Sequence, residues 1–137
     1  MRIELKRKND AFNFEASNEE GQIINMDASP DIGGENKGVR PTQLLPMALG
    51  GYSAIDITLI LKKQKQEITD FQISIEAERE TGQTANMFTS FHIIYKLTGN
   101  IDRGKAERAV ALSMEKYCSV AKTLEKTAKI TWEVQLY

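Results

Sequence analysis

The sequence predicts an α+β fold with mainly antiparallel sheets and one long central helix, and three observations lead to this prediction. Segments in which apolar and polar side chains alternate every two residues, as in strands, come in runs. One long segment instead repeats its apolar residues at helical spacings of three and four. Strands and helices are segregated along the chain, which favours α+β over a parallel α/β sheet. The expected order is β-β-β-α-β-β-α-α-β.

The N-terminal strands are predicted from alternation. Residues 2–8 place Ile3 and Leu5 on one face and charged side chains on the other, which is typical of a half-buried strand. The alternation continues around residues 12–14, and a third short strand is expected from 22 to 27. Polar turns separate the three segments. The first part of the chain is therefore expected to form an antiparallel meander.

Residues 28–40 predict a long loop, because they contain three glycines and a proline. Loops of this length in compact domains are often functional. The spacing of Gly33, Gly34 and Gly38 fits neither a P-loop nor a dinucleotide fingerprint. Lys37 also lacks the following Ser or Thr of a P-loop. A phosphate-binding loop is therefore not expected.

A long helix is predicted from Pro41 to about Gln66. Its apolar residues recur at helical spacing: Leu44, Leu45, Ala48, Leu49, Tyr52, Ile55, Leu59 and Ile60. Pro46 and the pair Gly50–Gly51 are expected to disturb it. The first half is apolar nearly all round, which indicates burial in a core or an interface. The lysine-rich end is solvated, and its cations suit a helix C-terminus.

The second half of the chain contains two more strands, two helices and a final strand. Residues 71–78 alternate, and 88–97 is apolar enough to be a central strand. Asp102 is expected to cap a helix that runs to Tyr117, followed by a short helix over 119–128. Alternation from 130 to 136 predicts the last strand.

Composition narrows the functional classes. A chain of 137 residues predicts one domain, 1–137, and a net charge of −1 argues against a nucleic-acid partner. One cysteine, Cys118, and one histidine, His92, exclude an intramolecular disulfide, a multi-cysteine zinc site and a His–His metal pair. We therefore expect no metal and no cofactor. Without a signal peptide or a long uncharged apolar run, we expect a cytoplasmic protein with no membrane partner.

Two motifs resemble those of a known family. Residues 40–56, RPTQLLPMALGGYSAID, are similar to a signature in which Pro-x-Glu/Gln-Leu-Leu leads to Gly-Gly-Cys. Residues 109–120, AVALSMEKYCSV, resemble a second signature of the same family. The chain is thereby identified as a member of the OsmC/Ohr family, nearest its YhfA-like branch. The resemblance implies an intertwined homodimer, with sheets wrapped around paired central helices and active sites at the interface.

The resemblance also implies a chemistry, from which this sequence departs. Family members reduce organic hydroperoxides with two cysteines, of which one attacks the peroxide and the second resolves the sulfenic acid, while an Arg and a Glu assist. Tyr52 occupies the position of the attacking cysteine, and Thr42 and Gln43 stand where an acidic residue is expected. Arg40 is the nearest candidate for the arginine. Only Cys118 matches a family cysteine, so it is the one candidate catalytic residue.

Alternatives remain open for these residues. Cys118 either reacts alone, favoured as a thiolate by a helix N-terminus, or is a buried remnant. Tyr52 either fills the former pocket or lines a remaining one and hydrogen-bonds a ligand. His92 is expected to be a satisfied sheet residue. Two functions follow: a stress-response protein with reduced or absent thiol peroxidase activity, or a non-catalytic dimer that binds a small apolar ligand or a partner in the interface cleft.

Overall fold

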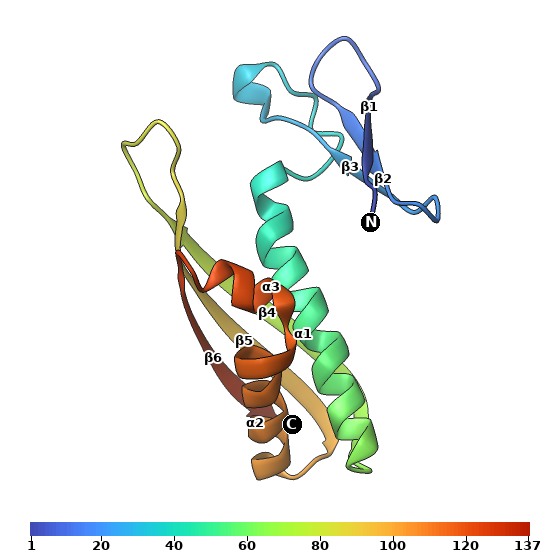
Figure 1. Cartoon of the computed structure of the whole chain (residues 1–137), viewed down its shortest axis with the longest axis vertical. Helices are drawn as coiled ribbons and strands as arrows, with labels where there is room; N and C mark the ends of the chain where they lie inside the picture. Colours follow the sequence, from blue (N-terminus) through green and yellow to red (C-terminus); the bar gives the residue numbers. More distant parts are fainter. The chain divides into compact units, whose positions relative to one another are not determined.

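The computed structural model describes all residues, 1–137, and divides them into two compact units, Met1–Leu45 and Pro46–Tyr137. The elements follow the predicted order of three strands, a long helix, two strands, two helices and a final strand (Figure 1). The predicted α+β class is therefore confirmed, with two three-stranded sheets and one long helix.

The first unit contains an antiparallel sheet of three short strands. These are β1 (Glu4–Arg7), β2 (Phe14–Ser17) and β3 (Ile23–Met26) in the order β1-β2-β3, as the meander predicted. The two buried residues of this unit are both polar, Asn13 and Asp27. Several large apolar side chains of the unit are exposed: Ile3, Leu5, Phe12, Phe14, Ile23, Ile24 and Ile32. This unit therefore has no apolar core of its own.

One carboxylate organises the long loop after β3. The Oδ1 atom of Asp27 accepts a hydrogen bond from the backbone N–H of Ala28 at 2.8 Å. Its Oδ2 atom accepts from the backbone N–H groups of Lys37 at 3.0 Å and Glu35 at 3.3 Å. The bond from Lys37 is the main reason why the pKa of Asp27 lies below its ordinary value. The loop is thus closed around a charged side chain, with one 3₁₀ turn at Pro30–Ile32.

The long helix α1 spans Leu44–Lys63 and follows a 3₁₀ turn at Pro41–Gln43. It runs without a break through Pro46 and Gly50–Gly51, so the disturbance expected there does not interrupt it. Pro46 lies in the first turn, where its missing N–H has no helical partner to lose. A Cβ atom on Gly50 would lie 3.0 Å from Cδ1 of Ile75, so glycine allows close packing of the helix on the sheet.

By length and composition, the segment Pro41–Lys63 would be able to cross a membrane, which the sequence analysis did not expect. Core helices of water-soluble proteins meet the same criterion. Here one face of α1 packs in the core through Leu49, Ile57 and Leu61. Asp56, near the middle of α1, is hydrogen-bonded to Ser113. These contacts favour a core helix.

The second unit is built on the sheet β4-β5-β6. Its strands are β4 (Glu67–Arg79), β5 (Phe88–Asn100) and β6 (Lys129–Leu136), and β5 is central as predicted. β5 pairs antiparallel with β4 and parallel with β6. Parallel neighbours need a crossover connection. Here α2 (Arg103–Leu112), a π-helical segment (Ser113–Tyr117) and α3 (Ser119–Leu124) supply it.

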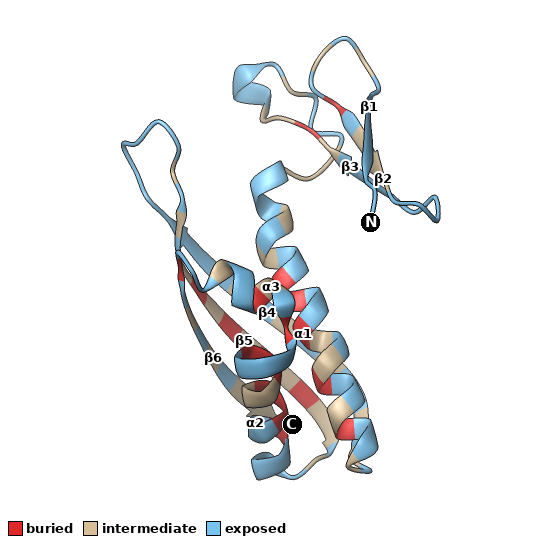
Figure 2. Ribbon diagram, in the orientation of Figure 1, coloured by how far each residue is buried: buried red, intermediate tan, exposed pale blue.

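The core lies on one face of β5. Alternate residues of this strand are fully buried: Phe91, Ile93, Tyr95 and Leu97 (Figure 2). They form one cluster with the inner residues of α1 and with Ala106, Ala109 and Val110 of α2. On the opposite face, Nδ1 of His92 lies 2.7 Å from Oγ1 of Thr131 and Nε2 lies 3.6 Å from Glu133. His92 is therefore the satisfied sheet residue that the sequence predicted.

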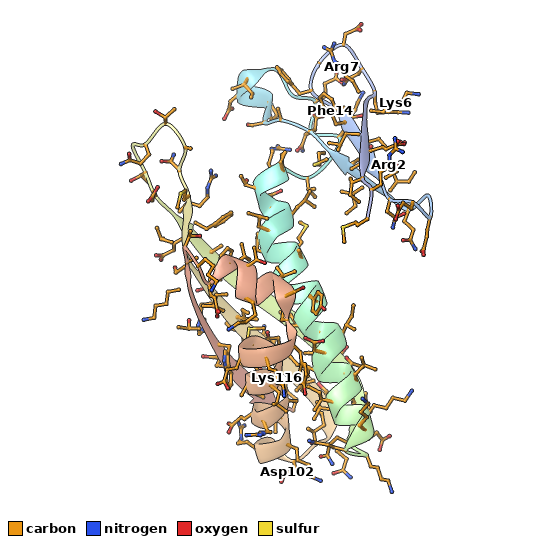
Figure 3. All side chains as sticks on the ribbon, viewed as in Figure 1. Arg2, Lys6, Arg7, Phe14, Asp102 and Lys116 are labelled. Carbon is orange, nitrogen blue, oxygen red and sulfur yellow. The ribbon has the colours of Figure 1, made fainter.

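The helix α2 runs back alongside α1. Asp102 caps its N-terminus by accepting from the N–H of Lys105 at 2.9 Å, as predicted (Figure 3). The N–H of Asp102 donates to Oε1 of Gln66, just beyond α1, at 2.8 Å. Ser113, just after α2, reaches the middle of α1. The two helices are therefore antiparallel neighbours on the same face of the sheet.

The change Asp27→Asn is expected to loosen the loop. The folded protein lowers the pKa of Asp27, so this carboxylate stabilises the fold above the ordinary aspartate pKa, and the contribution is lost as pH falls through the lowered pKa. The amides of Glu35 and Lys37 should exchange hydrogen faster in the variant at neutral pH. As pH falls through the lowered pKa of Asp27, the difference between the two proteins should shrink, because both then carry a neutral side chain.

Asp31→Asn provides the matched control. Asp31 lies in the same loop and is exposed, and its carboxylate accepts no hydrogen bond. Its replacement should leave the exchange of both amides unchanged. Equal exchange in Asp27→Asn and the natural protein would show that the loop does not depend on this carboxylate.

Candidate functional site

Tyr52 lies in the wall of a cleft on the second unit. The cleft has a volume of about 490 Å³. It is lined by residues of α1 and of the segment after α2: Tyr52, Asp56, Leu59, Ile60, Lys63, Gln64, Leu112 and Tyr117. The side chain of Tyr52 is 40% exposed, so the cleft beside it stays open. In this position the phenol can donate or accept a hydrogen bond at the cleft surface.

Asp56 connects the cleft to the π-helical segment. Its Oδ2 atom accepts a hydrogen bond from Oγ of the fully buried Ser113 at 2.9 Å. The carbonyl oxygen of Ser113 in turn accepts from the backbone N–H of Cys118 at 2.7 Å. Ser113 thus joins α1 on one side to the cysteine on the other. Bonds between residues this far apart in sequence fix the segment against the helix.

The π-helical segment determines which side chains face inward. On α2, Ala106, Ala109 and Val110 are buried, and a continued α-helical phase would bury Tyr117. The wider turn shifts that phase by one residue. Tyr117 is consequently 48% exposed and lines the cleft, while Cys118 is fully buried. The cysteine therefore lies under the site rather than in the cleft wall.

Two opposing effects act on the thiol of Cys118. It stands at the N-cap of α3, and its sulfur accepts a hydrogen bond from the N–H of Ala121 at 3.3 Å, which favours the thiolate. Burial has the larger effect and raises the pKa of Cys118 above its ordinary value. The helix N-terminus was predictable from the sequence, whereas the burial of the Cys118 side chain was not. Burial therefore disfavours the reactive thiolate at neutral pH.

The second unit also buries several polar groups. Ser53 is fully buried and donates its hydroxyl hydrogen to the carbonyl oxygen of Leu49 at 2.9 Å. Tyr95 is also fully buried, and desolvation raises the pKa of its phenol to about 12. The phenol is thus neutral at physiological pH. In the wall of the cleft, Oε1 of Gln64 is buried without a hydrogen-bond partner.

The other predicted residues belong to the first unit, and their hydrogen bonds lie within it. The guanidinium of Arg40 donates to the carbonyl oxygen of Gly38 at 3.1 Å and to Oδ1 of Asn36 at 2.9 Å. Oε1 of Gln43 accepts from the N–H of Arg40 at 3.0 Å. Thr42 is exposed in the turn before α1. These residues therefore lie in the segment just before the long helix, and their hydrogen bonds stabilise that segment.

Sequence reasoning missed four residues of the site. Asp56 carried a usable signal, because it is the one charged residue in the apolar half of α1. Lys63 looked like an ordinary solvated helix end. Ser113 and Tyr117 gave no signal, since their roles depend on the π-helical turn. No group of three or more His, Cys, Asp or Glu side chains is placed to hold a metal ion.

The chain matches a known protein family over most of its length. The family model described as OsmC-like protein matches residues 34–133. The chain is 35% identical over 123 residues to Protein YhfA of Escherichia coli (strain K12), covering 89% of this chain and 88% of that protein.

Solved structures are similar over nearly the whole chain. A hypothetical protein from Aquifex aeolicus VF5 aligns with a TM-score of 0.81 at 32% identity, covering 99% of this chain and 96% of that one. The organic hydroperoxide resistance protein OhrB of Bacillus subtilis aligns with a TM-score of 0.63 at 18% identity, covering 98% of this chain and 96% of that one. At that identity the second likeness shows the fold alone.

Cys118 is expected to react slowly with an aromatic disulfide reagent in the native protein and rapidly in concentrated guanidinium chloride, because burial limits both access and ionisation. Ser113→Ala should speed native labelling about tenfold, because a hydrogen bond to a charged acceptor is worth about 1.5–3 kcal/mol. The absorbance of the released thiol measures both rates.

Ser119→Ala is the control, since Ser119 also adjoins the cysteine but is exposed. Its labelling rate should equal that of the natural protein. Rapid labelling of the native protein would contradict the buried thiol, and an unchanged rate in Ser113→Ala would remove the role given to the Asp56–Ser113 bond.

Proposed function

Because the chain belongs to the OsmC-like protein family, we propose that it acts in the response to organic hydroperoxides with reduced or absent thiol peroxidase activity of its own. Several of the solved structures that share this fold are organic hydroperoxide resistance proteins. The observation that carries the reduced activity is the state of Cys118, which is fully buried with a raised pKa. We propose a cytoplasmic location as well, because free thiols stay reduced there.

The chemistry of thiol-dependent peroxide reduction explains why reduced or absent activity is proposed. A thiolate attacks the outer oxygen of the hydroperoxide, takes up that oxygen as a sulfenic acid, and releases the alcohol. A second thiol then displaces water from the sulfenic acid to form a disulfide. Tyr52 at the position of the attacking residue has no sulfur to accept the oxygen. Cys118 alone would need both access and ionisation, and burial opposes both.

A second candidate is a non-catalytic binding role, favoured by the cleft beside Tyr52. The cleft is large enough for a small organic molecule. Its wall combines apolar side chains with two phenols and two charged groups, so an amphipathic ligand suits it better than the purely apolar one expected from the sequence. In this role the protein would bind a small molecule in the cleft without converting it to a product.

We also propose a homodimer, which two observations support. The first unit has exposed apolar side chains and no buried one. One face of α1 is exposed and apolar through Tyr52, Ile55 and Leu59. Exposed apolar surface of this extent is typical of an interface. Leu59 also lines the cleft, so a second copy would complete the cleft wall.

The natural protein is expected to give no dithiothreitol-dependent reduction of cumene hydroperoxide above that of Cys118→Ser. Tyr52→Cys should gain measurable turnover, because it places a partly exposed thiol in the cleft wall. Consumption of the peroxide, followed with a colorimetric assay, measures both rates.

Ile55→Cys is the control for this gain, since it adds an exposed thiol to α1 one turn away, outside the residues that line the cleft. It should give no turnover. Activity of the natural protein that disappears in Cys118→Ser would overturn the proposed loss of peroxidase function. No gain in Tyr52→Cys would mean that more than the attacking sulfur is missing.

Ile55→Glu is expected to shift the proposed dimer to monomer, because burying an unpaired carboxylate at an apolar interface costs several kcal/mol. Sedimentation equilibrium measures the molecular mass. Thr84→Glu adds the same charge to an exposed position between β4 and β5, away from α1 in the sequence, and should leave the dimer intact. A natural protein that sediments as a stable monomer would contradict the proposal.

A further inference from the structure

We propose that the cleft binds a dipolar molecule with an ammonium group at one end, a carboxylate or similar anion at the other, and an apolar chain between them. This inference rests on the binding role proposed above and names its ligand class. The reason is the order of side chains along the cleft. A carboxylate (Asp56), an apolar stretch and an ammonium (Lys63) follow one another along α1.

The spacing along α1 sets the distance between the two charges. Asp56 and Lys63 are seven residues apart and lie on the same face, two helical turns from each other. With a rise of 1.5 Å per residue, their backbone positions are separated by about 10 Å. The two side chains form no ion pair with each other in the structure. A bound molecule of matching length can pair with both.

Both charges are free to take a ligand. Neither Asp56 nor Lys63 belongs to any of the ion pairs of the structure. Asp56 uses Oδ2 for the bond from Ser113, while Oδ1 has no partner. Oδ1 can therefore accept from an ammonium group without loss of the contact that holds the π-helical segment. Lys63 is exposed and has all its donors available.

Apolar side chains occupy the space between the charges. Leu59 and Ile60 come from α1, and Leu112 comes from the end of α2 on the facing wall. An alkyl chain in this stretch is removed from water, and each methylene that is buried contributes to binding. A molecule with a single charge would fill the apolar stretch but leave one end of the cleft unpaired.

The aromatic end of the cleft agrees with an ammonium beside Asp56. Tyr52 and Tyr117 both line the cleft; Tyr52 precedes Asp56 by about one turn of α1, and Tyr117 follows Ser113, the hydrogen-bond partner of Asp56, by four residues. Nζ of Lys116 already lies 5.5 Å from the centre of the Tyr117 ring, so that ring is in contact with a cation in this structure. The ring of Tyr52 has no cation and is available to the ligand.

The test compares four probes of equal chain length on the natural protein by isothermal titration calorimetry: 8-aminooctanoate, octanoate, octylamine and 1-octanol. We expect 8-aminooctanoate to bind about fivefold more tightly than either singly charged probe, the gain typical of one solvent-accessible ion pair. Asp56→Asn should lower its affinity to that of octanoate, and Lys63→Gln to that of octylamine.

Asp56→Asn and Lys63→Gln are chosen so that a change in affinity reports the loss of one charge. The amide oxygen of Asn can still accept from Ser113, so Asp56→Asn retains the bond that holds the π-helical segment. Lys62→Gln is the control for Lys63→Gln, because Lys62 is an exposed neighbour outside the cleft. It should leave the affinity for 8-aminooctanoate unchanged.

The relative affinities of the four probes distinguish a failure of the dipolar ligand class from a failure of the binding role. If 1-octanol binds as tightly as 8-aminooctanoate, the cleft binds apolar molecules, and the dipolar inference fails while the binding role stands. If octanoate or octylamine binds as tightly as 8-aminooctanoate, one charge is not used and the inference fails. If no probe binds, both fail, while the assay of Tyr52→Cys still decides the peroxidase question.

Discussion

The need to cover an apolar helix is the constraint on which the rest of this structure depends. α1 is apolar on nearly every side, and burial of apolar surface is the main stabilising term in folding. The sheet and α2 cover one face through Leu49, Ile57 and Leu61. The opposite face, with Tyr52, Ile55 and Leu59, stays exposed in the single chain. The same division creates the cleft and leaves an exposed apolar face, on which the proposed homodimer is based.

The π-helical turn shows how a local irregularity decides the chemistry of a residue. An extra residue in the last turn of the α2 segment brings Cys118 inward and turns Tyr117 out to the cleft. The N-terminus of α3 favours a thiolate at this position, yet desolvation has the larger effect. Burial therefore disfavours the thiolate of Cys118, while the polar groups of the cleft stay accessible.

Most of the fold was predictable because it follows from local patterns. Alternation gave the strands, including the central position of β5, and Asp102 gave the start of α2. The unbroken course of α1 was not predicted, because the effect of Gly50 depends on its close contact with Ile75 on β4. Of the site, Tyr52 and Cys118 came from the family resemblance, whereas the roles of Asp56 and Ser113 needed a contact between residues 57 positions apart.

The sequence by itself determined the α+β class, the order of the elements and the family. These properties depend on residue type and on spacing over a few positions, which the chain carries in one dimension. Only the tertiary structure decided that Cys118 is buried, that Tyr52 lines an open cleft, and that Asp56 and Lys63 share its wall with Tyr117. The physical reason is that desolvation and charge separation depend on what packs around a side chain, and those neighbours come from distant parts of the sequence.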